Sequence, residues 1–194
     1  MKTLVLATHS RGKITELQAL LPSIHCIAQT ELQISEAAET GLSFVENALI
    51  KARHASHHSH YPALSDDSGL VVDALNGQPG IYSARFAGAE ASDKDNIQKV
   101  LHALQEVAVE QRQAYFYCAM ALVRYPDDPT PILTFGRLDG VLLNEPQGEN
   151  GFGYDPIFFL PQYGQTLAEL NPEEKNRISH RAQALKSLIQ IAQW

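Results

Sequence analysis

The sequence predicts an α/β protein in which a mixed central β-sheet is flanked by helices. Short apolar runs, such as residues 3–8, are followed by helical patterns, such as residues 13–21. Two longer runs, residues 114–125 and 130–143, are joined by a Pro-Asp-Asp-Pro segment and are typical of a β-hairpin, which either extends the sheet or forms a second lobe. With 194 residues and 44% hydrophobic content, the chain can bury its core as a single domain, residues 1–194.

Composition and charge exclude several classes of protein. The formal net charge of −7 argues against a nucleic-acid-binding surface, because such a surface requires a basic stripe. No apolar run approaches the length of a membrane span, and the N-terminus becomes polar too early for a signal peptide, so we expect a cytoplasmic protein without a membrane partner. Cys26 and Cys118 lack a CxxC spacing, which favours two reduced thiols over a disulfide or a zinc pair.

Several helix starts are indicated by capping residues. Ser43 with Glu46 predicts a helix that continues to about residue 58, and Ser92 with Asp95 predicts another that continues to about residue 107. Further helix starts are expected at Thr166 with Glu169, at Asn171 with Pro172, and at Ser179.

The segment 63–73 carries two adjacent carboxylates, Asp66 and Asp67, between apolar runs. Gly69 follows them, so we expect the chain to turn there and the acids to lie at a strand end, where hard cations are commonly held. Because adjacent strand residues point to opposite faces, one aspartate would coordinate a ligand and the other would hold the turn. Asp-Asp-Ser-Gly is also ordinary turn chemistry, so a purely structural role is the alternative.

A second candidate site is the connection between the first strand and the first helix, His9-Ser10-Arg11-Gly12. Backbone amides and the positive end of a helix meet at such a turn and can bind phosphate, although a plain β-to-α connection has the same shape. Lys51 borders the apolar face of the helix that begins after Ser43. A lysine in that position either extends to solvent or contacts a phosphate.

Residues 151–155, Gly-Phe-Gly-Tyr-Asp, form a third candidate. The glycines allow backbone amides to approach a flat ligand and Phe152 offers a stacking face, while a Gly-rich loop around a core aromatic is the alternative. His180 and Arg181 follow Ser179 at a helix start. Because the helix dipole disfavours cations there, Arg181 should have a compensating partner, such as an anion or the acceptor edge of a base.

A group of histidines near the end of the predicted helix 43–58 raises the possibility of a metal site. His54 and His58 are one helical turn apart, but no acid or cysteine lies among the histidines. We therefore interpret the segment as a solvated helix end. The group comprises His54, His57, His58 and His60.

Along almost its whole length the sequence resembles the inosine triphosphate pyrophosphatase family, which clears noncanonical purine nucleoside triphosphates. The matching blocks are residues 4–8 with Gly12-Lys13, Glu39-Thr40-Gly41 with Phe44, Glu46-Asn47-Ala48, Lys51-Ala52, residues 66–70, Pro79-Gly80 with residues 82–85, residues 151–156, and Lys175 with residues 179–181. One loop differs, because the family usually has Thr-Gly-Asn where this chain has Thr8-His9-Ser10.

The resemblance implies an enzyme with its nucleotide in a cleft between two lobes, assembled as a homodimer. It would convert ITP, dITP or XTP to the monophosphate and pyrophosphate. Asp67 would be the catalytic carboxylate and, with Glu39, would hold Mg²⁺. The implied substrate-binding residues, which include the phosphate contacts and the base and ribose pocket, are Thr8, His9, Ser10, Arg11, Gly12, Lys13, Lys51, Ser68, Phe152, Gly153, Tyr154, Asp155, Lys175, His180 and Arg181.

Two other functions are weighed against this one. A nucleotide-binding module would sense the nucleotide without cleaving it, and Glu39 with Asp67 argues against that alternative. A hydrolase of similar fold would act on pyrimidine or modified nucleotides. The pyrophosphatase hypothesis requires Glu39 and Asp67 to lie close enough to share an ion, and Lys13 and Lys51 not to lie on unrelated surfaces.

Overall fold

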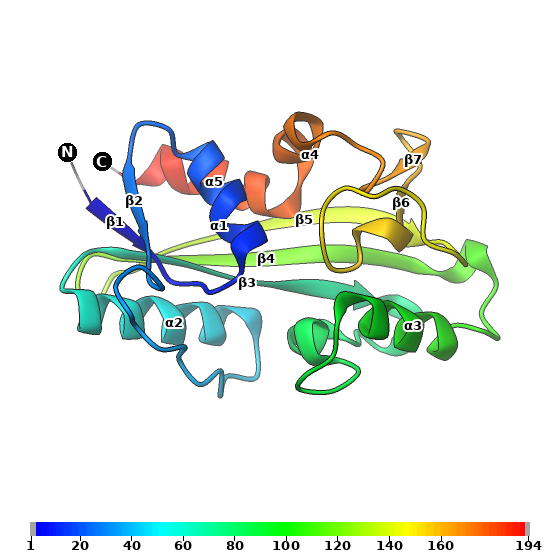
Figure 1. The fold of residues 1–194 in the computed structure, drawn as a ribbon, viewed down its shortest axis with the longest axis horizontal. Coiled ribbons are helices and arrows are strands. Elements are labelled where there is room, and N and C mark those ends of the chain that lie inside the picture. Colours follow the sequence, from blue (N-terminus) through cyan, green and yellow to red (C-terminus); the bar gives the residue numbers. More distant parts are fainter. Residues whose placement is uncertain (1–2, 193–194) are drawn as a thin grey trace. The chain divides into compact units, whose positions relative to one another are not determined.

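Seven strands form one mixed sheet within residues 3–192, the part of the chain that the computed structural model describes (Figure 1). The strands are β1 (Thr3–Leu6), β2 (His25–Ala28), β3 (Ala63–Val72), β4 (Gln113–Val123), β5 (Ile132–Leu142), β6 (Phe158–Leu160) and β7 (Gln165–Thr166). They pair in the order β2-β1-β3-β4-β5-β6-β7. Strand β1 runs parallel to β2 and β3, whereas β6 runs antiparallel to β5 and β7. The predicted mixed α/β sheet is confirmed.

The chain divides into two compact units, and three strands contribute residues to both. The first unit comprises Met1–Asp67, Cys118–Gly136 and Arg181–Trp194, and the second comprises Ser68–Tyr117 and Arg137–His180. The boundary within β3 falls directly after Asp67. The cleft that the sequence analysis expected between two lobes stays a prediction.

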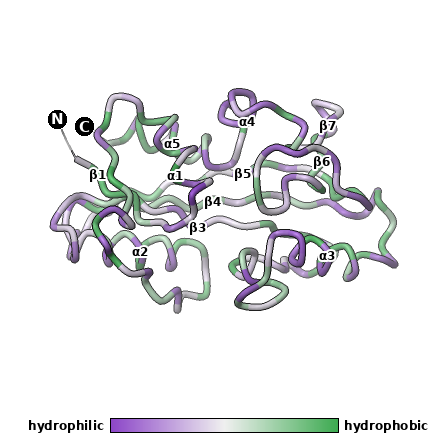
Figure 2. Tube along the Cα trace, viewed as in Figure 1, coloured by the Kyte–Doolittle hydropathy of each residue, from purple (hydrophilic) through white to green (hydrophobic). Residues whose placement is uncertain are grey.

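In the first unit, helices cover both faces of the strands. Helices α1 (Arg11–Leu20) and α5 (His180–Ile191) lie on one face, and α2 (Phe44–Ser59) lies on the other (Figure 1). Hydrophobic and hydrophilic residues alternate along α2, as Figure 2 shows, and its small apolar residues face inward. The core between α1, α5 and the strands includes Leu4, Leu6, Leu17, Leu64, Cys118, Met120, Leu185 and Leu188.

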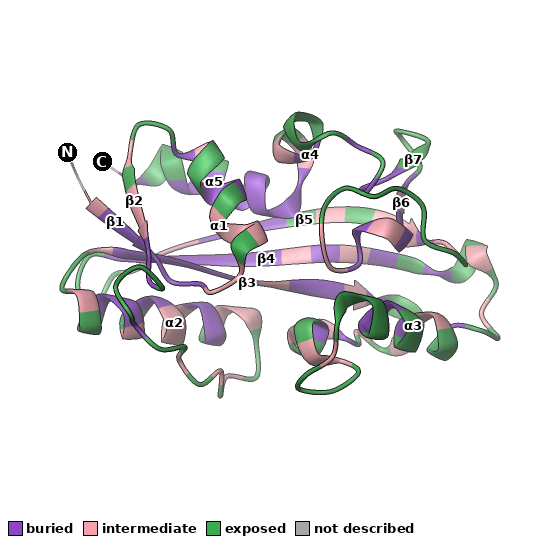
Figure 3. Ribbon diagram, viewed as in Figure 1, coloured by how far each residue is buried: buried purple, intermediate pink, exposed green. Residues whose placement is uncertain are grey.

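In the second unit, α3 (Asp93–Ala103) and α4 (Pro172–Ile178) pack with the distal halves of the strands. The core includes Leu70, Val72, Ile97, Val100, Phe116, Leu142, Tyr154, Ile157 and Phe158. Figure 3 shows β3 and β4 buried along most of their length. Short 3₁₀ segments, η1 (Asp73–Leu75), η2 (Gly80–Arg85), η3 (Val109–Gln111) and η4 (Asp155–Ile157), complete the connections.

The turn that we expected at Gly69 does not exist. Strand β3 continues from Ala63 to Val72 through both aspartates and the glycine. The glycine serves a different purpose, because a Cβ at position 69 would lie 2.4 Å from Ser83 Oγ and 2.5 Å from the carbonyl oxygen of Gly80. Gly69 therefore permits a close approach of neighbouring chain rather than a change of direction.

The predicted helix start at Thr166 is also wrong, since Thr166 ends β7 and residues 167–170 form a turn. Only the return bond of the capping pattern is present, with the Thr166 N–H donating to Glu169 Oε2 at 2.7 Å. The predicted starts at Ser43, Ser92 and Asn171 are confirmed, because each side chain accepts the expected backbone N–H. The predicted hairpin is confirmed as β4 and β5.

Both cysteines are free thiols, as predicted. Burial strongly raises the pKa of Cys118, which lies in the core of the first unit. Among the described residues, none of the helices combines the length and the hydropathy that a membrane span requires.

Candidate functional site

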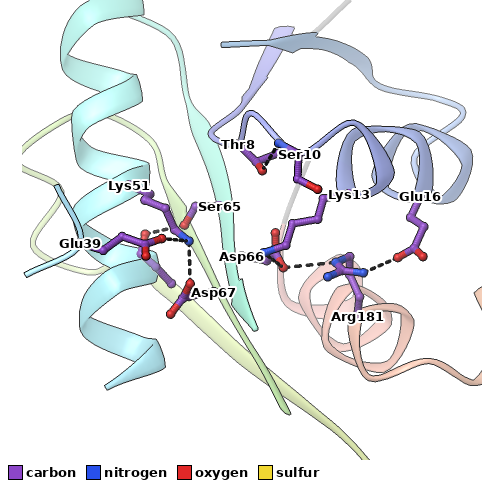
Figure 4. Close-up of polar contacts among 11 residues, drawn as sticks. Thr8, Ser10, Lys13, Glu16, Glu39, Lys51, Ser65, Asp66, Asp67 and Arg181 are labelled. Carbon is purple, nitrogen blue, oxygen red and sulfur yellow. Dashed lines mark hydrogen bonds and ion pairs between the residues drawn. The ribbon is translucent and has the colours of Figure 1, made fainter. Parts of the chain in front are cut away.

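Strand β3 presents Asp66 and Asp67 to opposite faces of the sheet. Because the strand is uninterrupted, its pleat alone separates the two side chains. Figure 4 shows Asp67 directed toward α2 and Asp66 directed toward α1 and α5. Both residues are buried, Asp66 to 1% and Asp67 to 6% exposure, so the partners on each face determine their charge.

On the α2 face, Lys51 bridges two carboxylates. Its Nζ lies 2.7 Å from Asp67 Oδ1 and 2.9 Å from Glu39 Oε1. Burial disfavours the ammonium, but the charges of Asp67, Asp66 and Glu39 outweigh that effect and raise the pKa of Lys51. Glu39 and Asp67 thus share one cationic partner, the Lys51 ammonium, and a metal ion shared by the two carboxylates stays a prediction. Lys51 does not extend to solvent, which was the alternative prediction.

One carboxylate oxygen of Asp67 lacks a hydrogen-bond partner in the part of the chain that the structure describes. Among residues 3–192, no hydrogen-bond donor reaches the buried Oδ2 atom of Asp67. Burial raises the pKa of Asp67, and the nearby Lys51 and Lys13 only partly oppose this effect. A buried carboxylate oxygen without a donor is a site at which a proton, a water molecule or a cation can be accommodated.

The segment that carries Glu39 is fixed to the first turns of α2. The Gly41 N–H donates to Asn47 Oδ1, and the Leu42 N–H donates to Glu46 Oε2, each at 2.9 Å. Gly41 packs so closely that a Cβ there would lie 2.5 Å from Glu46 Cβ. The same helix therefore holds the backbone beside Glu39 and supplies the lysine that bonds its side chain.

On the opposite face, Asp66 belongs to a buried cluster of alternating charges. Lys13 Nζ lies 3.0 Å and Arg181 Nε lies 3.2 Å from Asp66 Oδ2, and Arg181 also donates to Glu16 (Figure 4). Burial would favour the neutral acid, but Lys13, Arg181 and Lys51 outweigh it and hold the pKa of Asp66 far below the usual range. The same carboxylates raise the pKa of Arg181 against its own burial.

Arg181 therefore has the compensating partner that its position at a helix start required. Its partners in this structure include the carboxylates of Asp66 and Glu16. With a side-chain exposure of 2%, the guanidinium does not present itself to a ligand in this structure. The sequence analysis missed Glu16, although its spacing to Lys13, Leu17 and Leu20 places it on the inward face of α1.

The loop before α1 leaves the helix N-terminus without a side-chain cap. Ser10 is the N-cap residue, but its side chain makes no capping bond, and the first turn contains no acidic residue. The Ser10 N–H donates to Thr8 Oγ1 at 3.2 Å, which shapes the loop. His9 points elsewhere, with Nε2 3.0 Å from the carbonyl oxygen of Ile34. Arg11 and Gly12 form the first turn of α1.

The Gly-rich loop of the second unit is organised around Asp155. Asp155 Oδ2 accepts the Phe152 N–H at 2.9 Å and lies 2.7 Å from Lys175 Nζ. Lys175 Nζ also lies 4.5 Å from the centroid of the Phe152 ring, within cation–π distance. Gly151 is required here, because its φ is +79° and a Cβ would lie 2.1 Å from Asp155 Oδ2.

The remaining predicted residues of the second unit are Tyr154, His180 and Ser68, and each has a different environment. The Tyr154 hydroxyl donates to the carbonyl oxygen of Ser83 at 2.8 Å, and burial together with Asp93 strongly raises the pKa of Tyr154. The His180 ring stacks on Phe116 with centroids 4.8 Å apart and planes 9° apart. Ser68 follows Asp67 in β3. The structure thus gathers Phe152, Gly153, Tyr154, Asp155 and Lys175 into one loop site.

The histidine segment is a helix end, as interpreted from the sequence. His60 is the left-handed C-cap of α2, and His54 Nε2 lies 2.9 Å from the carbonyl oxygen of Ser35. Among the described residues, no group of three or more His, Cys, Asp or Glu side chains is arranged to hold a metal ion.

The comparisons with known proteins agree over nearly the whole chain. A sequence model of the Ham1 family matches residues 4–191. The chain is 57% identical over 188 residues to a dITP/XTP pyrophosphatase of Legionella pneumophila (strain Lens), covering 97% of each chain. It is 52% identical over 191 residues to the dITP/XTP pyrophosphatase of Escherichia coli (strain K12), again covering 97% of each chain.

Solved structures give the same result for the fold. A HAM1 protein from Coxiella burnetii superposes with a TM-score of 0.91 at 49% identity, covering 98% of both chains. The Ham1 protein of Staphylococcus aureus superposes with a TM-score of 0.87 at 39% identity, covering 98% of this chain and 97% of that one. Sequence and fold lead to one conclusion: the chain belongs to the Ham1 family.

Proposed function

We propose that this protein hydrolyses noncanonical purine nucleoside triphosphates, such as dITP, ITP and XTP, to the monophosphate and pyrophosphate. The relatives named dITP/XTP pyrophosphatases support the substrate class, at 52–57% identity along 97% of the chain. The observation that carries the proposal is the pair of carboxylates, the buried Asp67 and the partly exposed Glu39, gathered around the ammonium of Lys51.

This pair fits a divalent cation such as Mg²⁺. Mg²⁺ is usually held by one or two carboxylates, with water and substrate phosphates completing its shell, so a cluster of three protein ligands is not required. Glu39 and Asp67 would supply the carboxylates, and Asp67 Oδ2 is the buried oxygen that lacks a donor among the described residues. When bound there, the cation would neutralise negative charge on the phosphate oxygens.

Lys51 has two tasks under this proposal. Before substrate binds, its ammonium keeps Glu39 and Asp67 together despite their like charges. When a metal–triphosphate complex enters, the flexible lysine can move from the carboxylates to a phosphate oxygen, because its four-carbon stem allows the head group to change partner. The residue that assembles the site would thus also bind the substrate.

Asp67 would act as the proton acceptor for the attacking water. Oδ2 would face the cation, and Oδ1, which Lys51 holds before substrate binds, would become the acceptor when the lysine moves to a phosphate oxygen. Because burial raises the pKa of Asp67, the carboxylate is a stronger base than an ordinary aspartate. Attack of the water on the α-phosphorus breaks the bond to the β-phosphate bridge and releases pyrophosphate.

The N-terminus of α1 would receive the phosphate chain. Its first amides lack a side-chain cap, and Lys13 in the same first turn brings a positive charge, 16% exposed, toward Asp66. Amides and lysine together are suited to bind an anion. In the second unit, Phe152 would stack on the purine, with Lys175 and Asp155 beside it.

Selection against adenine follows from hydrogen-bond chemistry. Hypoxanthine and xanthine present the O6 acceptor beside the N1 donor, whereas adenine presents a donor beside an acceptor. A site that pairs with the first pattern leaves groups unpaired with the second, at a cost of about 1 to 3 kcal/mol for each buried mismatch.

Release of pyrophosphate across a panel of nucleotides tests the proposal. The panel is inosine, xanthosine, guanosine, adenosine, deoxyuridine and methylated pyrimidine triphosphates with Mg²⁺, and the Asp67→Asn variant serves as the control. We expect preferential cleavage of the inosine and xanthosine nucleotides. Binding of inosine triphosphate without pyrophosphate release would instead identify a sensing module, and preference for a pyrimidine would identify the other hydrolase.

The site of action and the assembly state are part of the proposal. A substrate drawn from the cellular nucleotide pool is consistent with a cytoplasmic enzyme, and the family resemblance favours a homodimer. Light scattering coupled to size-exclusion chromatography measures the mass directly, and a species near 21.4 kDa, the mass of one chain, would contradict the dimer.

A further inference from the structure

Two successive backbone N–H groups of the Gly-rich loop are held by two different carboxylates. Phe152 N–H donates to Asp155 within the loop, whereas Gly153 N–H donates to Asp93 Oδ2 at 2.7 Å, from a residue 60 positions away in sequence. Both contacts lie within the second unit. The aromatic residue therefore has a carboxylate anchor on each side of its backbone.

The bond to Asp93 acts at an open position of the loop. Gly153 adopts a φ of +62°, and a Cβ there would meet nothing within 4 Å, so there is open space on this side of the residue. Asp93, by contrast, lies on the first turn of α3. That turn is held to the preceding loop by Asn96, whose Oδ1 accepts the Ala87 N–H at 2.8 Å.

We propose that Asp93 is a positioning residue that holds Phe152 in the orientation required to stack on a purine base. The proposal rests on the proposed function, in which Phe152 contacts the base. Asp93 acts through the Gly153 amide and does not itself need to touch the nucleotide. The bond joins an ionised acceptor to a backbone donor, which makes it stronger than a neutral hydrogen bond.

Loss of this anchor should affect binding of the base more than chemistry at the phosphate. Asp93→Ala should raise KM for dITP about three- to tenfold, because an exposed charge-assisted bond is worth less than a buried one, while kcat changes by less than about twofold. Stacking favours the larger purine surface, so the ratio of kcat/KM for dITP over dUTP should also fall.

Two further variants separate positioning from stability. Asp93→Asn keeps an acceptor oxygen and should restore most of the KM. Asp95→Ala removes the capping box of the same helix without touching the loop, and should lower the unfolding midpoint while leaving KM near that of the wild type.

Hydrogen exchange measured by mass spectrometry provides a readout that does not depend on activity. The peptide containing residues 150–156 should exchange faster in Asp93→Ala than in the wild type, and it should stay protected in Asp95→Ala. Faster exchange with unchanged KM and unchanged base preference would overturn the positioning role. Unchanged exchange would overturn the anchor itself. Failure of the wild type to release pyrophosphate from dITP would instead reject the proposed function.

Discussion

Asp66 and Asp67 are consecutive residues of one strand, yet the two faces of β3 surround them differently. Asp66 has a side-chain exposure of 0% and faces two cations, Lys13 and Arg181, within a cluster that also includes Glu16. Asp67 faces one cation, Lys51, which it shares with Glu39.

The comparison shows how burial gives opposite results for the same side chain. Burial disfavours the charged form of both aspartates, but only Asp66 has enough positive charge nearby to reverse the effect. The pKa of Asp66 is lowered and that of Asp67 is raised. Asp66 thereby becomes a permanent anion that binds three elements together, while Asp67 keeps the capacity to accept a proton.

Asp67→Asn should have the largest effect, and it tests directly whether Asp67 accepts a proton while Asp66 does not. The amide cannot accept the proton from water, so turnover of dITP should fall by about 10²- to 10⁴-fold. The measurement is pyrophosphate release at saturating substrate and Mg²⁺. Because Asp67 pays a burial cost as an anion, the unfolding midpoint should stay the same or rise. Turnover within a few fold of the wild type would remove Asp67 from the mechanism.

Asp66→Asn should have its main effect on stability. It leaves Arg181 and Lys13 buried with less negative charge, and breaking a buried ion pair typically costs about 3 to 5 kcal/mol of unfolding free energy. Urea unfolding followed by circular dichroism measures the change. A decrease in the unfolding free energy of less than about 0.5 kcal/mol, the range of an ordinary surface substitution, would show that the cluster does not stabilise the fold.

The stability of the wild type should also depend on pH through Asp66. Its folded pKa is lower than the unfolded value of about 3.9, so its contribution is complete above that value and is lost as pH falls toward the folded pKa. Below pH 5, the unfolding free energy of Asp66→Asn should therefore decline less steeply than that of the wild type. Equal slopes would contradict the lowered pKa.

Lys51→Met tests the role of the ammonium that contacts Asp67 on the α2 face of β3. Turnover should fall about 10- to 100-fold, because the triphosphate loses a charge-assisted contact. Mg²⁺ binding in the absence of nucleotide should become tighter, since the variant lacks the ammonium that occupies the space between Glu39 and Asp67. Isothermal titration at pH 8 measures this binding. Weaker binding in the variant would show that Lys51 supports the metal rather than competing with it.

The smallest expected effect is on the acid limb of the pH–rate profile. Asp67 must be ionised to accept a proton, and its raised pKa means that the ionised fraction begins to fall at a higher pH than for an ordinary aspartate. The inflection in kcat/KM should therefore lie above about 3.9. An inflection at or below that value would contradict the raised pKa.

Local patterns in the sequence predicted much of the fold. The capping box of Ser92 and Asp95, the hairpin of β4 and β5, and the helix start at Asn171 all depend on residues a few positions apart, which sequence alone can relate. Thr166 with Glu169 has the same local pattern but lies at the end of β7, where strand pairing decides the structure.

The errors at the site have a common physical cause. Asp-Asp-Ser-Gly has the composition of a turn, but contacts distant in sequence keep it extended. Gly69 leaves room for the close approach of Ser83, and Asp66 is bonded to Arg181, 115 residues away. The local pattern does not reveal these partners. Spacing did predict that adjacent aspartates point to opposite faces, and that expectation holds in β3.

The central claim is that Asp66 and Asp67 have opposite protonation behaviour, and a carbon-13 NMR titration of the aspartate carboxyl groups tests it most directly. The Asp66→Asn and Asp67→Asn variants assign the two signals. The account predicts that the Asp67 signal titrates above about 3.9, while the Asp66 signal shows no transition at or above that pH. Two transitions at the ordinary value, or Asp66 titrating above Asp67, would contradict it.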